Sequence, residues 1–264
     1  MQALDSRSEF IFDRKHQLFL NFIDHTDQAK NAVTYLEKFI FDVAVKNTWK
    51  SHVKYLDIGC GYGYKTQPII NAIKKYCFVD TTAIDPSSEL LSIFKRQLES
   101  ENINFACSTW ENFNPIGNFD LITSIHTFYY IDNWEAAIKK MVSYLDEQGV
   151  ICIAIRSNDE VCQFKDYFFK KIYGENKSER NFNELVDVVA SNNFQYKTDI
   201  IQSKLNVADC LLENENGIQL IEFLLRIPYV DIANDIKDEI KQYLKKHQHD
   251  GYLMHEDGFI WISK

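Results

Sequence analysis

The chain has 264 residues, of which 29 are basic and 38 are acidic, so its formal net charge at neutral pH is −9. A hydrophobic fraction of 45% and a charged fraction of 25% are ordinary for a globular protein. The acidic balance argues against a general nucleic-acid or anionic-membrane binder, because both need a basic face. Only 9 Gly and 4 Pro are present, too few for a linker-rich or disordered chain.

Cysteine usage and apolar runs indicate the compartment. The six cysteines are scattered without a CxxC pair, so we expect a reducing compartment and no structural zinc or other metal. Charged residues interrupt the first thirty positions, so no signal peptide is expected. The most apolar strand-like run, 150–155, ends at Arg156, far short of the ~18 residues of a membrane helix. A cytoplasmic protein is therefore predicted.

The first part of the chain alternates helix-like and strand-like segments. Apolar spacing predicts two helices between about residues 8 and 46, with Thr26 and Asp27 at the turn between them. Strands are expected at 53–58, 77–84, 103–107, 119–125 and 150–155, the last after a turn at Gln148–Gly149, and helices at 65–75, 87–98 and 134–145. This alternation predicts βαβ units and a doubly wound parallel sheet that is covered on both faces.

The last hundred residues are mostly helical in pattern. Helices are expected near 161–172, 182–191, 218–225 and 232–247, and strands at 194–205 and 252–263. Because no linker or repeat intervenes, we expect these parts to pack on or complete the sheet in a single integrated domain. The predicted division is N-terminal helices at 1–50 that form part of a substrate lid, a core at 51–156, and substrate-binding helices with the terminal strands at 157–264.

Three glycines, Gly59, Gly61 and Gly63, lie in the first strand-to-helix turn. In an open parallel sheet this turn approaches a ligand closely, and glycine lets backbone N–H groups meet it without an intervening Cβ. The alternative, a tight turn without a ligand, rarely needs three alternate glycines. Tyr64 stands where both the GxGxxG dinucleotide fingerprint and the P-loop require glycine, so pyrophosphate ligands are disfavoured.

An acidic residue, Asp85, ends the second strand of the predicted sheet. A carboxylate at this place can accept hydrogen bonds from both hydroxyls of a ribose. The alternative role is an N-cap for the helix that begins at Ser87. Together with the glycine loop, Asp85 favours a nucleoside ligand.

Three segments, Leu56–Gly63, Ala83–Ser87 and Asn118–Ile122, resemble the motifs of class I S-adenosylmethionine-dependent methyltransferases. The resemblance implies a Rossmann-like doubly wound sheet with added N-terminal helices, S-adenosylmethionine as cofactor and S-adenosylhomocysteine as product. It also implies that segment 108–111 borders the adenine, with Glu111 supplying the contact that many relatives make from the position of Thr109. The implied cofactor-binding residues are Asp57, Gly59, Cys60, Gly61, Gly63, Asp85, Pro86, Thr109, Trp110, Glu111 and Ile125.

A narrower likeness is to the histamine N-methyltransferase family, carried by segments 22–27, 128–131, 208–210, 214–217 and 258–262. In that family three polar positions hold the imidazole-ethylamine substrate. Here these positions are occupied by Gln28 (or Asp27 if the loop shifts by one residue), His126 and His255. The likeness implies a small-molecule amine or imidazole substrate and a monomer.

Methyl transfer needs a neutral lone pair about 3 Å from the methyl group, in line with the methyl–sulfur bond, and exclusion of water. His126, at the end of strand 119–125, is a candidate to take the acceptor's proton or to orient the acceptor, as is His255; a structural role is the alternative for both. Tyr129 is a candidate for an aromatic box around a cationic amine.

The function predicted from these residues is in-line methyl transfer to a nitrogen of a small amine or imidazole-containing compound. One alternative is a methyltransferase that acts on a nitrogen or oxygen of a protein, peptide or natural product. A second alternative is a catalytically silent homologue of the fold that acts as a binding protein.

Overall fold

The computed structural model describes residues 16–45, 49, 51–98, 103–174 and 180–264. The chain divides into two compact units. Unit 1 comprises residues 1–29, 157–179 and 202–256, and unit 2 comprises residues 30–156, 180–201 and 257–264. The predicted boundary after residue 156 coincides with a unit boundary, whereas the expected segments 1–50 and 157–264 are each divided between the units. Part of the first predicted helix, residues 8–15, lies outside the described residues.

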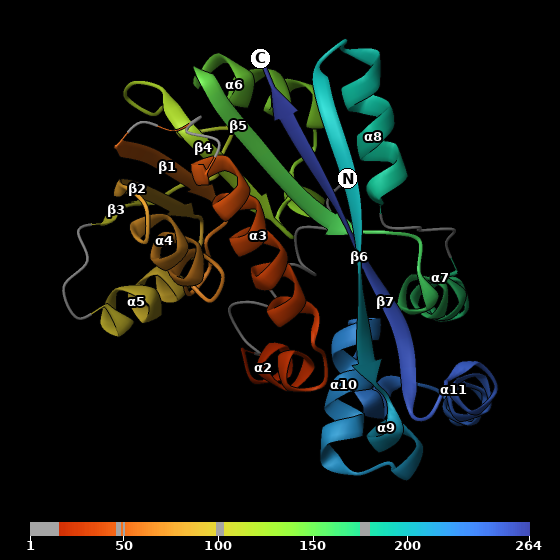
Figure 1. Cartoon of the computed structure of the whole chain (residues 1–264). Coiled ribbons are helices and arrows are strands. Elements are labelled where there is room, and N and C mark those ends of the chain that lie inside the picture. The colour runs from red at the N-terminus through yellow and green to blue at the C-terminus, as the bar shows by residue number, and fades with distance from the viewer. Residues whose placement is uncertain (1–15, 46–48, 50, 99–102, 175–179) are drawn as a thin grey trace. The chain divides into compact units, whose positions relative to one another are not determined.

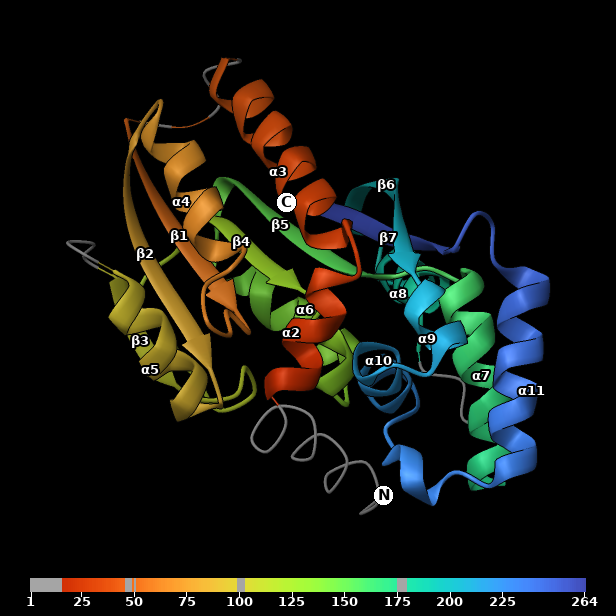
Figure 2. The ribbon, with the colours of Figure 1, turned by 90° about the horizontal axis from the view of Figure 1, so that it is seen from below.

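The sheet has the strand order β3-β2-β1-β4-β5-β7-β6 (Figure 1). Strands β1 to β5 pair in parallel, and β7 is antiparallel to β5. Figure 2 shows β2, β1, β4 and β5 side by side. The doubly wound prediction is therefore confirmed, with an antiparallel strand added. The strands are β1 (His52–Ile58), β2 (Phe78–Asp85), β3 (Ile103–Cys107), β4 (Phe119–Ile125), β5 (Leu145–Arg156), β6 (Gln195–Asn206) and β7 (Tyr252–Ser263).

The predicted turn at Gln148–Gly149 is wrong, because β5 runs through it. Phe119 pairs with Leu145, but Leu121 already pairs with Val150, so extra residues of β5 bulge out of the ladder here. A Cβ on Gly149 would lie 2.7 Å from the carbonyl oxygen of Phe119. The glycine therefore permits close backbone approach inside a bulged strand.

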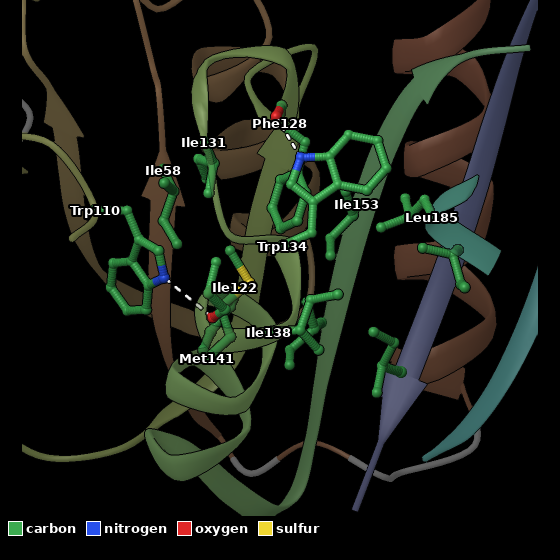
Figure 3. Close-up of a cluster of buried hydrophobic side chains, with 14 of the residues drawn as sticks. Ile58, Trp110, Ile122, Phe128, Ile131, Trp134, Ile138, Met141, Ile153 and Leu185 are labelled. Carbon is green, nitrogen blue, oxygen red and sulfur yellow. Dashed lines mark hydrogen bonds between the residues drawn. The ribbon is translucent and has the colours of Figure 1, made fainter. Parts of the chain in front are cut away.

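Helices cover both faces of the sheet in unit 2. On one face, α3 and α4 bury Leu36 and Ile69 against Tyr55 of β1, and Figure 1 shows both helices in front of the strands. On the other face, α6 and α8 bury Trp134 and Leu185 in the cluster of Figure 3. The unit 2 helices are α3 (Gln28–Val45, of which residues 28 and 29 belong to unit 1), α4 (Thr66–Lys74), α5 (Ser88–Gln97), the 3₁₀ turn η1 (Phe128–Tyr130), α6 (Trp134–Ser143) and α8 (Phe182–Ser191).

Unit 1 has a hydrophobic core of its own. Phe22, Phe164, Leu220 and Leu244 are buried together, from four different helices. The short helix α9 and the turn η2 were not expected from the sequence. No helix among the described residues is long and apolar enough to cross a membrane. The unit 1 helices are α2 (His16–Asp24), α7 (Glu160–Tyr173), α9 (Ala208–Leu212), α10 (Glu215–Leu225), η2 (Tyr229–Asp231) and α11 (Asn234–His247).

Candidate active site

The glycine loop follows β1, and its three glycines all adopt positive φ, at 76° for Gly59, 53° for Gly61 and 83° for Gly63. A Cβ on Gly59 would lie 2.1 Å from Thr127, and a Cβ on Gly63 would lie 2.2 Å from the ring of Phe94. A Cβ on Gly61 would meet nothing within 4 Å. Two glycines are therefore required by packing, whereas Gly61 faces open space where a ligand can approach the backbone.

Asp85 is held in a fixed orientation beside this loop. Its Oδ2 accepts a hydrogen bond from the N–H of Gly61 at 2.9 Å, and its Oδ1 accepts one from the N–H of Ser87 at 2.9 Å. The N-cap of α5 is Ser87, whose hydroxyl accepts from the N–H of Leu90. Because Ser87 fills the capping role, the geometry favours the ribose-binding role for Asp85, and the loop and carboxylate together fit a nucleoside.

Asp57 lies beneath the loop and is only 4% exposed. Its two carboxylate oxygens accept hydrogen bonds from the hydroxyls of Thr123, at 2.6 Å, and Thr66, at 2.5 Å. Burial raises the pKa of Asp57 more than these two hydroxyls lower it. Asp57 thus ties β1 to β4 and α4. Burial also raises the pKa of the Cys60 thiol, so it remains protonated at neutral pH.

The turn predicted to border the adenine starts beside Asp85, since the N–H of Ser108 donates to the carbonyl of Asp85 at 3.1 Å. The side chains of Thr109 and Glu111 are exposed. The indole of Trp110 is buried in the core and donates to the carbonyl of Ala137 at 3.1 Å (Figure 3). Trp110 therefore anchors the turn to α6, through its indole and through its carbonyl, which accepts a hydrogen bond from Nζ of Lys140 at 2.7 Å.

The remaining two predicted cofactor-binding residues flank these elements. Pro86 directly follows Asp85, at the end of β2. Ile125 is the last residue of β4 and is buried. Both lie at the carboxyl edge of the parallel strands, where ligands bind in open α/β sheets.

His126 directly follows β4 and has φ of 59°, a left-handed conformation that is uncommon for a residue other than glycine. Its backbone N–H donates to the carbonyl of Ala154 at 2.8 Å. Its Nε2 lies 3.3 Å from Oδ2 of Asp257, whose side chain is 1% exposed against 17% for His126. Such conformations concentrate at functional sites. A buried carboxylate therefore backs the imidazole at the end of β4.

Tyr129 contacts the other side of the same imidazole. Its hydroxyl lies 3.3 Å from Nδ1 of His126 and accepts a hydrogen bond from the N–H of Arg156 at 2.6 Å. The guanidinium of Arg156 lies 5.4 Å from the centroid of the Tyr129 ring. The structure thus brings together two predicted residues, His126 and Tyr129, with Asp257, which the sequence analysis did not single out.

Lys65 is a second charged group that the sequence analysis missed. Burial lowers the pKa of this ammonium, while the carboxylates of Asp257 and Asp57 act in the opposite direction. Lys65 is the N-cap residue of α4, directly after the glycine loop. Asp57 lies in β1, just before the glycine loop, but Asp257 comes from β7, so nothing in the sequence indicated that Lys65 lies near both carboxylates.

His255 and Gln28 lie together in unit 1. Nε2 of His255 is 3.2 Å from Nε2 of Gln28 and 3.7 Å from Oδ2 of Asp159. The amide N–H of Gln28 can donate to Nε2 of the neutral imidazole when that nitrogen carries no hydrogen. The alternative residue, Asp27, accepts a hydrogen bond from the N–H of Lys204 at 2.7 Å. Of the two, Gln28 therefore pairs with His255.

A protein-family model described as a methyltransferase domain matches residues 7–194, more than half of the chain. A malonyl-[acyl-carrier protein] O-methyltransferase of Bacillus anthracis is 21% identical over 197 residues, covering 73% of this chain and 70% of that protein. Another, from Priestia megaterium, is 29% identical over 112 residues, covering 42% of this chain and 40% of the relative. The match thus spans less than half the length of the Priestia enzyme.

Solved structures give the same fold. The plantazolicin methyltransferase BpumL, in complex with a pentazolic desmethylPZN analog and SAH, superposes with a TM-score of 0.60 at 17% identity, covering 98% of this chain and 95% of that chain. The YcgJ protein from Bacillus subtilis superposes with a TM-score of 0.56 at 14% identity, covering 85% and 97% of the two chains.

The class I resemblance drawn from the motifs is confirmed by these comparisons, as is S-adenosylmethionine as the cofactor. These relatives do not support the narrower likeness to the histamine N-methyltransferase family, because the curated ones are named as O-methyltransferases. The described residues contain no cluster suited to a metal ion. The chain therefore belongs to the methyltransferase domain family and has the fold of methyltransferases whose solved structures hold SAH.

Proposed function

We propose that the chain transfers a methyl group to a nitrogen of a small amine or imidazole-containing compound, with His126 as the final acceptor of the proton that this nitrogen loses. The observation that carries the proposal is the pairing of His126 with the buried carboxylate of Asp257 at 3.3 Å. A carboxylate at this distance favours the protonated imidazole, which makes the ring a better proton acceptor.

The possible methyl acceptors differ in whether they must lose a proton during the reaction. An amine is protonated near neutral pH and must lose a proton before its lone pair can attack. A carboxylate acceptor, such as a malonyl group, already has a lone pair and loses no proton. The histidine and aspartate pair therefore supports a nitrogen acceptor over a carboxylate.

The bound cofactor supplies a methyl group activated by the sulfonium. The residues of this chain hold and shield it. Asp85 is oriented to accept the ribose hydroxyls, and the open side of Gly61 admits the ligand to the backbone. His255 and Gln28, which pair within unit 1, keep their predicted role in acceptor binding as a separate proposal. Because no covalent nucleophile is needed, positioning and water exclusion account for most of the rate.

A second candidate is methyl transfer to an acyl-carrier-bound or peptide substrate. It is supported by the names of the relatives, which include malonyl-[acyl-carrier protein] O-methyltransferases and a plantazolicin methyltransferase. If the methyl acceptor is a malonyl carboxylate, as in the named relatives, no proton has to be transferred to His126.

The test is incubation of the protein with methyl-labelled S-adenosylmethionine and a panel of histamine, tryptamine, phenethylamine, catechol and a malonyl thioester. The expected result is labelling of an amine or imidazole nitrogen, with kcat about 10²–10⁴-fold lower in His126→Asn. Asparagine tolerates the left-handed backbone, so the fold is kept.

The matched control is His52→Asn, which removes an exposed histidine paired with Asp80 at 2.8 Å, at the opposite end of β1. It should leave the rate unchanged. Exclusive labelling of the malonyl thioester, or an undiminished rate in His126→Asn, would overturn the proposal in favour of the second candidate.

A further inference from the structure

Both ring nitrogens of His126 face groups of the protein. Nε2 lies 3.3 Å from a carboxylate oxygen of Asp257, and Nδ1 lies 3.3 Å from the hydroxyl of Tyr129. The rings of His126 and Tyr129 are nearly parallel, with an interplanar angle of 18° and centroids 6.3 Å apart. Among the described residues, Asp257 and Tyr129 thus stand at the two ring nitrogens.

One strand pair supports both contacts. Asp257 of β7 stands directly opposite Arg156 of β5 in the antiparallel ladder. The N–H of Arg156 donates to the hydroxyl oxygen of Tyr129 at 2.6 Å. The guanidinium of Arg156 also lies over the ring of Tyr129. The positions of Tyr129 and Asp257 on either side of His126 are thus fixed by the same register.

The chemistry of the two neighbours selects the tautomer of neutral His126. The 3.3 Å contact between Nε2 and Oδ2 of Asp257 is an ion-pair contact without hydrogen-bond geometry. An ionised carboxylate only accepts hydrogen bonds and attracts positive charge, so it favours a hydrogen on Nε2, the nitrogen that faces it. Nδ1 then holds the lone pair. The Tyr129 hydroxyl, which accepts from Arg156, can direct its own hydrogen toward Nδ1. The basic lone pair of the imidazole therefore points at the tyrosine.

Resting on the proposed function, we propose that the hydroxyl of Tyr129 takes the acceptor's proton and passes its own proton to Nδ1 of His126. The N–H bond of the acceptor breaks, and its electron pair stays on nitrogen for attack on the methyl carbon. An O–H bond forms on Tyr129 as its original O–H bond breaks, and an N–H bond forms at Nδ1. The resulting imidazolium is paired with Asp257, and no oxidant or reductant is needed.

Under this proposal Tyr129 is the catalytic residue that touches the acceptor, and His126 and Asp257 act behind it. Among the described residues, the charged groups around this relay are Asp257 from β7, beside the imidazole, Lys65 from the end of the glycine loop, which interacts with Asp257, and Arg156 from β5, whose guanidinium lies over the Tyr129 ring. Asp257→Asn should therefore shift the pH–rate profile, because a neutral amide no longer stabilises the imidazolium.

The first test is spectroscopic and needs no acceptor. The full chain, labelled with ¹⁵N-histidine and bound to S-adenosylhomocysteine, is examined by NMR, and His126→Asn assigns the signals. Neutral His126 is expected to be protonated at Nε2 and not at Nδ1, and Tyr129→Phe should move the Nδ1 resonance. A neutral ring protonated at Nδ1 would overturn the relay.

The second test is a double-mutant cycle on single-turnover methylation of histamine, or of the panel amine that is turned over fastest. Tyr129→Phe should lower the rate about 10–100-fold with KM nearly unchanged, and addition of His126→Asn should cost no more than the larger single effect, since both act on one proton path. Tyr130→Phe, which changes an exposed neighbour in the same turn (45% exposed), is the matched control and should keep the rate.

The outcomes separate the two proposals. The relay is overturned if His126→Asn is slow while Tyr129→Phe keeps a rate within about twofold of the parent. It is also overturned if the rate losses of the two single variants multiply in the double variant. Either result leaves the proposed function standing. Methylation of the malonyl thioester alone, at equal rates in parent and both variants, overturns both proposals.

Discussion

The backbone N–H of Gly61 donates a hydrogen bond to Oδ2 of Asp85 at 2.9 Å. This contact joins the two local motifs that were visible in the sequence, the glycine loop after β1 and the acidic end of β2. It exists because β1 and β2 are parallel neighbours in which Ile58, the last residue of β1, pairs with Ile84, the residue before Asp85. The carboxylate is therefore oriented before any ligand arrives.

The orientation of Asp85 predicts a large effect of its replacement on cofactor binding. Asp85→Asn exchanges a charged acceptor for an amide that must turn one N–H toward the donors of Gly61 or Ser87. Charge-assisted hydrogen bonds contribute about 1.5–3 kcal/mol, so Kd for S-adenosylhomocysteine should rise about 10–100-fold by calorimetry. Asp80→Asn, an exposed aspartate of the same strand, is the control and should bind as the parent does. Equal affinity of Asp85→Asn and the parent would rule out the ribose role.

The three glycines should respond differently to substitution by alanine. Gly61→Ala places its Cβ in open space and costs about 1–2 kcal/mol of stability through the positive φ alone. The new methyl group occupies the ligand side, so cofactor affinity should fall while the fold persists. Gly63→Ala forces a Cβ within 2.2 Å of Phe94 and should cost about 3 kcal/mol or more. Urea unfolding and calorimetry on both variants check this contrast, which fails if Gly61→Ala binds the cofactor normally.

The parts of the site that could be predicted are those encoded locally. The glycine loop and His126 directly follow β1 and β4, and Asp85 ends β2, so identifying each strand also placed these residues at the ligand edge of the sheet. Asp257 could not be placed in this way, because its contact with His126 depends on β7 lying antiparallel beside β5. The alternation of apolar residues indicates which face of the sheet each residue of β7 occupies, but it does not indicate which strand pairs with β7.

The same limit explains the division into units. The apolar faces of α7, α10 and α11 predicted that these helices are buried, but periodicity does not state against which partner. In the structure Phe164, Leu220 and Leu244 pack with Phe22 of the N-terminal helix α2 in a core of their own. The bulge at Gly149 was missed for a related reason, since a glycine inside a strand and a glycine in a turn look alike in sequence.

Asp57 predicts a pH dependence of stability. Burial raises its pKa in the folded state above the ordinary value of 3.8. A raised folded pKa means that the folded state holds the proton more tightly, so this contribution to stability is fully present below the unfolded pKa and is lost as pH rises through the folded pKa. In Asp57→Asn this loss is absent. The free energy of unfolding of Asp57→Asn relative to the parent should therefore be more favourable at pH 7.5 than at pH 4, measured by urea titration. A difference that is constant with pH would contradict this.

Gln28 and His255 provide a test of whether a predicted substrate residue is also structural. Both are buried in unit 1, at 6% and 5% exposure, with their side-chain nitrogens 3.2 Å apart. Gln28→Ala removes a polar neighbour from a buried imidazole, which should cost about 1–3 kcal/mol in urea unfolding. Asn31→Ala, three residues later in α3, is the control and should cost less, because Asn31 is only partly buried.

If Gln28 also binds the acceptor, as proposed, KM for the amine substrate should rise in Gln28→Ala while Kd for S-adenosylhomocysteine is unchanged. A stability loss with KM unchanged would assign Gln28 to the structure alone, because only a residue that meets the acceptor changes KM without changing cofactor affinity.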